Sequence, residues 1–318
     1  MTRKKKGCLA ASAAVLVFGV ILLRWATDRV LDPIIHNVLN PPRRTTEEFI
    51  RNGVKVTPQQ YGGKGEEVYI EGEGGVRLRG WFMPSYGNLK SSPLVILLHG
   101  MGDGCELMLE AGVGLQKAGV NSLSVDHRGF AKSEGLLSFG VYEREDVRRW
   151  IGWARREKGI QGPVGIYGGS YGAGVGLQAL AVNPEVSCMV ALHPFTDLRS
   201  LLRSQVKDYI GFGWIPLVTT FAENKFYREI GARGADDVSA LSLLEKRDRV
   251  PPIFLVHGTA DRVIPVEHSR WLSERFPESV EYVEIQGMGH EDPFKKGPPD
   301  LNSRIQQFLT RNLSTRTE

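Results

Sequence analysis

The chain has 318 residues, of which 42% are apolar and 24% are charged, as in an ordinary globular protein with one large domain or two small ones. The formal net charge of +4 becomes −1 when the five basic residues around the first apolar run are set aside, namely Arg3, Lys4, Lys5, Lys6 and Arg24. No basic patch with interleaved aromatic residues is present, so the sequence does not indicate a nucleic-acid partner.

The three cysteines indicate neither a metal site nor a disulfide framework. Cys8, Cys105 and Cys188 lack metal-ligand or redox spacing, and their odd number does not suit paired disulfides. We interpret Cys188 as a buried core thiol and Cys105 as a residue that takes no part in a reaction. No metal or other cofactor is implied.

Residues 1–25 have the pattern of an uncleaved signal-anchor, a single transmembrane helix. A cationic head precedes 17 uncharged residues from Gly7 to Leu23, followed by Arg24 and Trp25. The flanking sequence offers only a poor site for signal peptidase. A cleaved signal peptide and a buried soluble helix are the alternatives. The basic head predicts a cytoplasmic N-terminus, with the rest of the chain on the extracytoplasmic side of the membrane.

Residues 26–60 are interpreted as a connector, because "DPIIHNVLNPPRR" carries three prolines and few apolar repeats. The main domain is expected at residues 61–318. It opens with "EEVYIEG" and "VRLRGWFMP", which predict an antiparallel strand pair. Five short apolar runs follow, each ending in glycine or polar residues: "PLVILLHG", "NSLSVDHRG", "GPVGIYGGS", "VSCMVALHP" and "PPIFLVHG".

Helical patterns lie between these runs, and "EREDVRRWIGWARRE" is the clearest. Its Val147, Trp150, Ile151 and Ala154 fall at helical spacing and form one apolar stripe. Apolar strands that alternate with such helices predict an α/β fold, with a mostly parallel sheet covered on both faces. The chemistry of open sheets of this kind gathers at the carboxyl ends of the strands.

Ser170 stands at one such strand end, in "GGSYG", which fits the pattern G-x-S-x-G. A sharp turn from strand to helix crowds the backbone two residues on either side of the serine, so glycine is required at Gly168 and Gly172. A hydrolytic serine also needs a base and an acid that orients this base. Asp261 follows the strand in "IFLVHGTAD", and His290 follows a later strand in "VEIQGMGH". We therefore predict a triad of these three residues.

The remaining candidates are given other roles. His257 is interpreted as structural, and His193 as a residue of a pocket, a cap or the core. Asp126 and His99 are expected to shape their loops. The oxyanion hole is predicted to combine two backbone N–H groups, those of Tyr171 and Met101.

The segments "HGMG", "DHRGFAKSEG", "GGSYGAG", "HGTADRVIP" and "GMGH" resemble the α/β-hydrolase superfamily across residues 65 to 312. Within it the chain is similar to membrane-anchored hydrolases of the serine-aminopeptidase and prolyl-oligopeptidase type. The resemblance implies an eight-stranded sheet with a cap after the sixth strand, at about residues 194–251. One departure is Ala131, which stands where relatives often have glycine.

The sequence thus predicts a serine hydrolase that forms an acyl-enzyme, and a carboxylic ester is the expected substrate. A peptidase or amidase of the serine-aminopeptidase type, acting on short peptides, and a thioesterase are the alternatives. A ligand binder without activity is disfavoured because such proteins usually have a broken triad. The expected partners are a small ester, acyl or peptide substrate and, through residues 1–25, a membrane.

Overall fold

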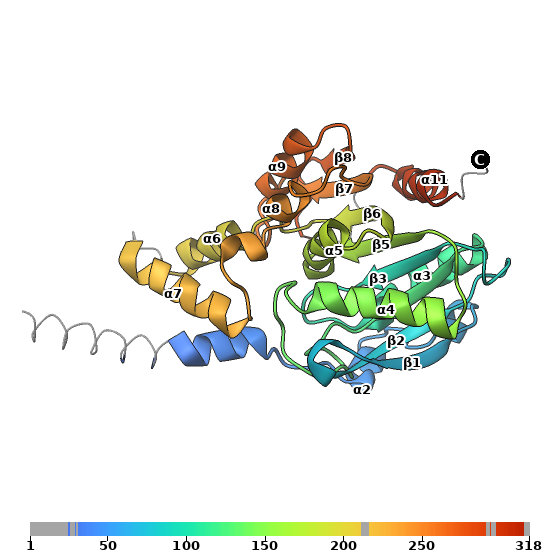
Figure 1. Cartoon of the computed structure of the whole chain (residues 1–318), viewed down its shortest axis with the longest axis horizontal. Helices are drawn as coiled ribbons and strands as arrows, with labels where there is room; N and C mark the ends of the chain where they lie inside the picture. Colours follow the sequence, from blue (N-terminus) through green and yellow to red (C-terminus); the bar gives the residue numbers. More distant parts are fainter. Residues whose placement is uncertain are drawn as a thin grey trace, which may run out of the picture.

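The computed structural model describes residues 25, 29, 31–210, 216–290, 293 and 297–314. Within this part of the chain the strands form one eight-stranded sheet, in the spatial order β1-β2-β4-β3-β5-β6-β7-β8. Figure 1 shows this sheet with helices packed around it. The strands are β1 (Glu66–Glu71), β2 (Arg77–Met83), β3 (Leu94–Leu98), β4 (Asn121–Val125), β5 (Val164–Gly169), β6 (Val186–Leu192), β7 (Ile253–Gly258) and β8 (Val280–Ile285).

The sheet is mostly parallel, as predicted. β1 pairs with β2 and β2 with β4 in antiparallel fashion, which confirms the expected strand pair. All the pairs from β4 through β3 to β8 are parallel. The carboxyl ends of six strands therefore meet at one edge of the sheet, and the residues that follow them are brought together there.

The two faces of the sheet pack against different helices. Leu94, Ile96 and Leu98 of β3 belong to one apolar cluster, whereas Val95 and Leu97 belong to a second, because successive side chains of a strand point to opposite faces. The first cluster includes residues of α4 (Glu143–Glu157), α5 (Tyr171–Val182), α8 (Ala240–Leu244) and α9 (Glu267–Arg275). The second includes residues of α3 (Leu109–Lys117) and α11 (Leu301–Leu313). The sheet is thus covered on both faces.

Helix α4 confirms the clearest sequence prediction. Its bounds are those of the segment "EREDVRRWIGWARRE". Val147, Trp150, Ile151 and Ala154 are all buried, so the predicted stripe is the face that packs on the sheet. Glu143 is the first residue of this helix and is buried as well.

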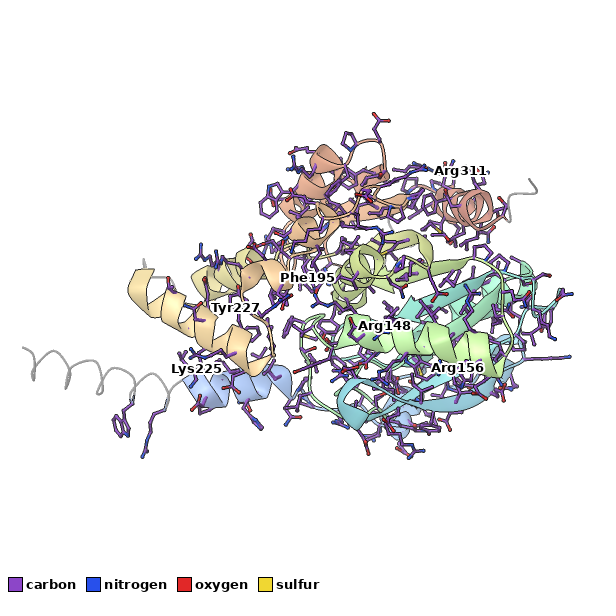
Figure 2. The ribbon with its side chains drawn as sticks, in the orientation of Figure 1. Arg148, Arg156, Phe195, Lys225, Tyr227 and Arg311 are labelled. Atoms are coloured by element: carbon purple, nitrogen blue, oxygen red, sulfur yellow. The ribbon has the colours of Figure 1, made fainter. Side chains whose placement is uncertain are left out.

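The insertion after β6 contains α6 (Leu198–Ile210), α7 (Pro216–Glu229), the short 3-10 helix η4 (Ala235–Asp237) and α8. Figure 1 shows α6 and α7 extending away from the sheet. The two helices are joined by Arg203 and Glu223, whose Nε and Oε1 atoms lie 2.6 Å apart. Phe195 lies where this cap meets α5, and its ring centroid is 6.4 Å from that of Tyr171 (Figure 2). These helices occupy the part of the chain where the resemblance implies a cap, and their role as a cap remains a prediction.

The segment expected to be a connector is more structured than its prolines suggested. Residues 31–39 are helical, and α2 (Thr46–Arg51) follows with a capping box between Thr45 and Glu48. Ile35 and Leu39 are buried in the first apolar cluster. Ile35 and Leu39 are four positions apart and form a short apolar stripe on the helix. This stripe is buried by contacts with distant parts of the chain, and the sequence of the segment itself does not reveal those contacts.

Polar contacts also hold this N-terminal segment in place. Lys225 of α7 lies beside the 31–39 helix (Figure 2), with its Nζ atom 2.6 Å from Oδ1 of Asp32. Arg43 donates to the carbonyl oxygen of Ser133 at 2.8 Å, and Nη1 of Arg44 lies 3.2 Å from Oδ1 of Asp103 in the loop after β3. The segment thus connects the cap with two loops at the carboxyl edge of the sheet.

The predicted transmembrane run, residues 7–23, lies outside the described residues. Among the helices that the structure describes, none combines the length and the apolar character that a membrane span requires.

Candidate active site

Ser170 lies in a sharp turn between β5 and α5. Its backbone has a φ of 52° and a ψ of −117°, a conformation that costs energy for a residue other than glycine. A Cβ atom at Gly168 would lie 2.6 Å from the carbonyl oxygen of Gly172, and one at Gly172 would overlap the carbonyl oxygen of Leu98. The requirement for glycine at both positions is therefore confirmed.

His290 and Ser170 meet at the carboxyl edge of the sheet. His290 follows β8, and its Nε2 atom lies 2.9 Å from Oγ of Ser170. Its Nδ1 atom lies 2.7 Å from Oδ2 of Asp261. A carboxylate can only accept, so Nδ1–H donates to Asp261, and Nε2 is left to accept the hydroxyl proton of Ser170. The structure thus brings together the three residues predicted from the order of the chain.

Asp261 is held by the turn that follows β7. Its Oδ1 atom accepts from the backbone N–H groups of Val263 at 2.8 Å and Ile264 at 2.9 Å. Burial alone raises the pKa of Asp261, but hydrogen bonds from His257, His290 and the Ile264 amide outweigh it and hold the pKa well below its usual range. Asp261 therefore stays ionised at neutral pH and can stabilise a positive charge on His290.

His257 is part of the support for Asp261, which agrees with its predicted structural role. It is fully buried in β7, and its Nε2 atom lies 2.9 Å from the carbonyl oxygen of Ile264 and 3.2 Å from Oδ2 of Asp261. Because both of these oxygens accept, Nε2 carries the proton, and Nδ1 accepts from Oγ of Ser269 at 2.6 Å. His257 thus adds a further donor to the carboxylate.

His193 contacts the same site from the end of β6. Its Nδ1 atom lies 3.8 Å from Oδ2 of Asp261, and its ring centroid is 5.4 Å from that of His290. It has a φ of 49°, so its backbone shares the left-handed strain of Ser170. Sequence reasoning left its role open between pocket and core, and the only signal for it was its position after a strand.

The two predicted oxyanion donors lie at the start of α5 and in the loop after β3, as expected. Tyr171 is the first residue of α5, directly after Ser170. Met101 lies in the loop after β3, and the neighbouring Gly100 is so close to the serine that a Cβ atom there would lie 3.7 Å from Cβ of Ser170. The start of α5 and the loop after β3 therefore both border the serine side chain. The role of their backbone N–H groups remains a prediction.

Two loops at this edge are fixed by the residues expected to shape them. Oδ1 of Asp126 accepts from the backbone N–H of Cys105 at 2.7 Å. Nδ1 of His99 lies 2.7 Å from the carbonyl oxygen of Gly100, and Nε2 accepts from the backbone N–H of His127 at 3.1 Å. Cys105 is buried, and burial raises the pKa of its thiol, so it is unsuited to act as a nucleophile.

Two clusters within the described residues contain the side-chain types that bind metals. One is His193, Asp261 and His290, whose atoms take part in the contacts just described. The other is Cys105, Glu106 and Asp126, in which Nη1 of Arg79 lies 2.6 Å from Glu106 and 3.2 Å from Asp126. Arg79 already supplies the positive charge in this second cluster. The expectation of no metal remains a prediction.

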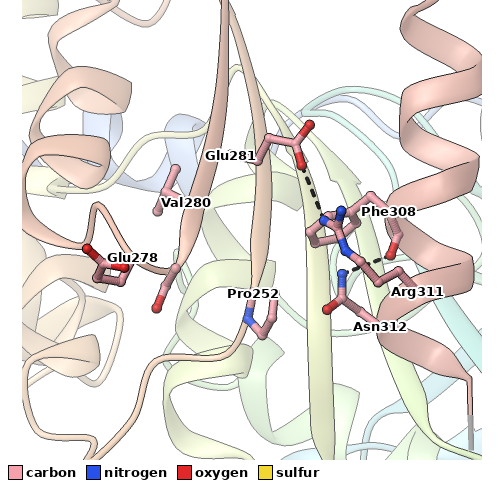
Figure 3. A pocket seen from close by; sticks show the side chains of 8 residues that line it. Pro252, Glu278, Val280, Glu281, Phe308, Arg311 and Asn312 are labelled. Atoms are coloured by element: carbon pink, nitrogen blue, oxygen red, sulfur yellow. Dashed lines mark hydrogen bonds and ion pairs between the residues drawn. The ribbon is translucent and has the colours of Figure 1, made fainter.

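A groove of about 280 Å³ lies at the opposite end of the strands (Figure 3). It is lined by Pro252 before β7, by residues at the start of β8, and by Phe308, Arg311 and Asn312 of α11. Because β7 and β8 are parallel, this groove is separated from Asp261 and His290 by the length of the strands. It takes no part in the site around Ser170.

The comparisons with known proteins agree with this architecture. Residues 93–213 match a family model described as the alpha/beta hydrolase fold. An uncharacterized protein of Mycobacterium tuberculosis is 24% identical over 303 residues, which are 95% of this chain and 94% of that protein.

Solved structures give the same result. An esterase of Pyrococcus furiosus has a TM-score of 0.66 and 25% identity, over 87% of this chain and 98% of the esterase. An acylaminoacyl peptidase has a TM-score of 0.62 and 19% identity, over 80% of this chain and 43% of that protein. These matches show that the chain has the α/β-hydrolase fold, and they support a hydrolase.

Proposed function

We propose that the protein is a serine hydrolase that cleaves carboxylic esters through an acyl-enzyme. One observation carries the proposal: Ser170, His290 and Asp261 form a hydrogen-bonded chain with distances of 2.9 and 2.7 Å. A nucleophile, a base and a group that orients the base, all within hydrogen-bonding reach, are the arrangement that activates a hydroxyl.

In the first half of the reaction, Oγ of Ser170 bonds to the substrate carbonyl carbon as its proton passes to Nε2 of His290. The carbonyl oxygen becomes an oxyanion, which the N–H groups of Tyr171 and Met101 stabilise. Asp261 stabilises the positive charge on His290 and holds the ring in place. The carbon–oxygen bond to the alcohol then breaks, and His290 returns the proton to the leaving oxygen.

In the second half, water attacks the acyl-enzyme. His290 removes a proton from the water, the second oxyanion forms in the same place, and the bond to Oγ of Ser170 breaks. The carboxylic acid leaves, and Ser170 regains its proton from His290. His290 carries every proton transfer in both halves of the reaction, so the mechanism needs no further acid or base.

The choice of ester over amide is supported by the likeness to the Pyrococcus furiosus esterase, which spans 98% of that protein. The likeness to the acylaminoacyl peptidase, at 19% identity, concerns the fold. To test this choice, the full chain is assayed with p-nitrophenyl acyl esters, aminoacyl anilides and acyl thioesters under one set of conditions. We expect kcat/KM to be highest for an ester. A higher kcat/KM for an anilide than for an ester would assign the protein to the peptidases. A higher kcat/KM for a thioester would assign it to the thioesterases.

We further propose that residues 1–25 anchor the protein in a membrane, with the hydrolase domain on the extracytoplasmic side. The proposal rests on the basic head and the 17 uncharged residues that follow it. Extraction of membranes with alkaline carbonate should leave the full chain in the pellet. Release of the intact chain into the supernatant would contradict the proposal.

A further inference from the structure

Glu143 is a buried carboxylate that lies next to the residue after the nucleophile. Only 1% of its surface is exposed, and its Oε1 atom accepts a hydrogen bond of 2.9 Å from the phenol of Tyr171. Burying a carboxylate is costly unless donors surround it. The four donors here are neutral: the phenol of Tyr171, the backbone N–H and the hydroxyl of Ser138, and the backbone N–H of Gly140.

The same carboxylate organises the loop that precedes α4. Ser138 N–H donates to Oε1 at 2.7 Å and Gly140 N–H to Oε2 at 2.9 Å. Phe139, between them, has a φ of 51°, which is strained for a residue with a side chain. The amide of Gln178 on α5 donates to the carbonyl oxygen of Phe139 at 2.8 Å. The loop is thus fastened to α4 through Glu143 and to α5 through Gln178.

The ring of Tyr171 packs against both ends of the segment that joins β4 to α4. It is 2% exposed, with its centroid 5.2 Å from that of His127, 5.5 Å from that of Phe139 and 5.8 Å from that of Phe130, all in edge-to-face contacts. Burial first, and then the charge of Glu143, raise the pKa of the Tyr171 phenol well above its ordinary value. The phenol therefore remains a donor at any pH at which the enzyme works.

We propose that Glu143 and the hydroxyl of Tyr171 are positioning groups for the reaction: their hydrogen bond fixes the backbone N–H that directly follows Ser170. The inference rests on the proposed serine-hydrolase function, in which this N–H stabilises the oxyanion. Neither side-chain group contacts the reacting atoms. The hydrogen bond holds the Tyr171 ring, and the ring in turn holds the backbone N–H of Tyr171. A small displacement of this N–H weakens it as a preorganised donor to the oxyanion.

Tyr171→Phe is the most direct test, because it removes one oxygen atom and keeps the packed ring. We expect kcat for an ester to fall about tenfold while KM changes less than about twofold, since a donor displaced from the oxyanion weakens transition-state binding more than substrate binding. A trifluoromethyl ketone, which forms a tetrahedral adduct with the serine, should bind more weakly by a similar factor. Glu143→Gln should lower kcat as well, and adding Tyr171→Phe to it should cause little further loss, because both changes break the same hydrogen bond.

Asp146→Asn is the matched control. Asp146 is a buried carboxylate on the same helix, but it pairs with Arg128 at 2.8 Å and accepts from the backbone N–H of Glu73, with no contact to Tyr171. This variant should lower the Tm and leave kcat of the folded enzyme within about twofold.

The inference is contradicted if kcat of Tyr171→Phe stays within about twofold of wild type, or if Asp146→Asn lowers kcat as much as Tyr171→Phe does. Ser170→Ala, measured in parallel, separates this failure from a failure of the proposed function. If Ser170→Ala is inactive and Tyr171→Phe is unchanged, only the positioning role is lost. If Ser170→Ala remains active, the triad itself is wrong.

Discussion

The two ends of the parallel strands differ in how much backbone strain they contain. At the carboxyl end, the loops after β4, β5 and β6 hold the four described non-glycine residues with positive φ, namely Ala131, Phe139, Ser170 and His193. At the opposite end, the turns that lead into β4 and β5 use Gly119 and Gly159 for their positive φ. Glycine adopts such angles without strain, whereas other residues keep them only when their surroundings enforce them.

Buried histidines show the same asymmetry. His99, His127, His193, His257 and His268 are all buried, and they lie on or after the carboxyl halves of the strands. Burial lowers the pKa of His127 well below its ordinary value, and it lowers the pKa of His268 to about 4. The carboxyl end therefore combines backbone strain with buried titratable groups, a combination that is typical of functional sites.

The largest expected effect comes from Ser170→Ala. Removing the nucleophile should lower kcat for an ester by about 10⁴-fold or more, with little change in Tm. Arg311→Ala, in the groove at the opposite end, serves as the control and should leave kcat unchanged. If Ser170→Ala turned over the ester at nearly the wild-type rate, the carboxyl end of the strands would not hold the nucleophile.

Asp261→Asn should have the next largest effect on turnover. An amide at this position can no longer hold His290 with its proton on Nδ1 and its free nitrogen facing Ser170, and loss of this orientation costs about 10³- to 10⁴-fold in kcat. Steady-state kinetics at pH 7 would measure it. If kcat fell less than about tenfold, Asp261 could not be the residue that orients His290.

Acid should destabilise the carboxyl end through His268, which accepts a hydrogen bond at Nδ1 from the backbone N–H of Thr196. Its pKa is about 4 in the folded protein and near 6.5 in the unfolded chain. Between these values only the unfolded chain takes up the proton, so stability falls by about 3 kcal/mol as the pH falls from 6.5 to 4.

Asn retains an acceptor near the position of Nδ1 but does not titrate. The stability of His268→Asn should therefore depend less on pH over this range, as measured by urea unfolding at several pH values. Equal pH dependence in the two proteins would show that His268 is protonated in the folded state as readily as in the unfolded chain.

The smallest expected effect is that of Ala131→Gly. Ala131 has a φ of 42°, and relief of left-handed strain is worth about 1 to 2 kcal/mol, part of which the greater freedom of glycine in the unfolded chain offsets. We expect a gain of about 0.5 kcal/mol in the free energy of unfolding, visible as a small rise in Tm. A fall in Tm would show that the Ala131 side chain stabilises the loop more than its backbone strain costs.

Much of the fold could be predicted because its signals are local. The stripe of α4 follows from helical spacing, and the glycines beside Ser170 follow from the crowding of one turn. Asp261 and His290 could be found because parallel strands bring residues from distant strand ends to one edge. These predictions needed only the period of each element and the order of the chain.

The remaining features depend on contacts between distant residues, which no local pattern reveals. In the sequence, Glu143 is an ordinary acidic residue in the first turn of a predicted helix. Its contact with Tyr171 arises only in the folded chain. Likewise the stripe of Ile35 and Leu39 has no partner within its own segment. Whether a polar residue, or an apolar residue outside a clear periodic pattern, is buried depends on the tertiary structure.

The central claim is that His290 activates Ser170, and covalent labelling tests it most directly. The full chain is treated with a fluorophosphonate, and the modified residue is identified by mass spectrometry, in parallel with His290→Ala. We predict labelling at Ser170 in the wild-type protein and its loss in the variant. Labelling at another residue, or equal labelling of Ser170 with and without His290, would contradict the account.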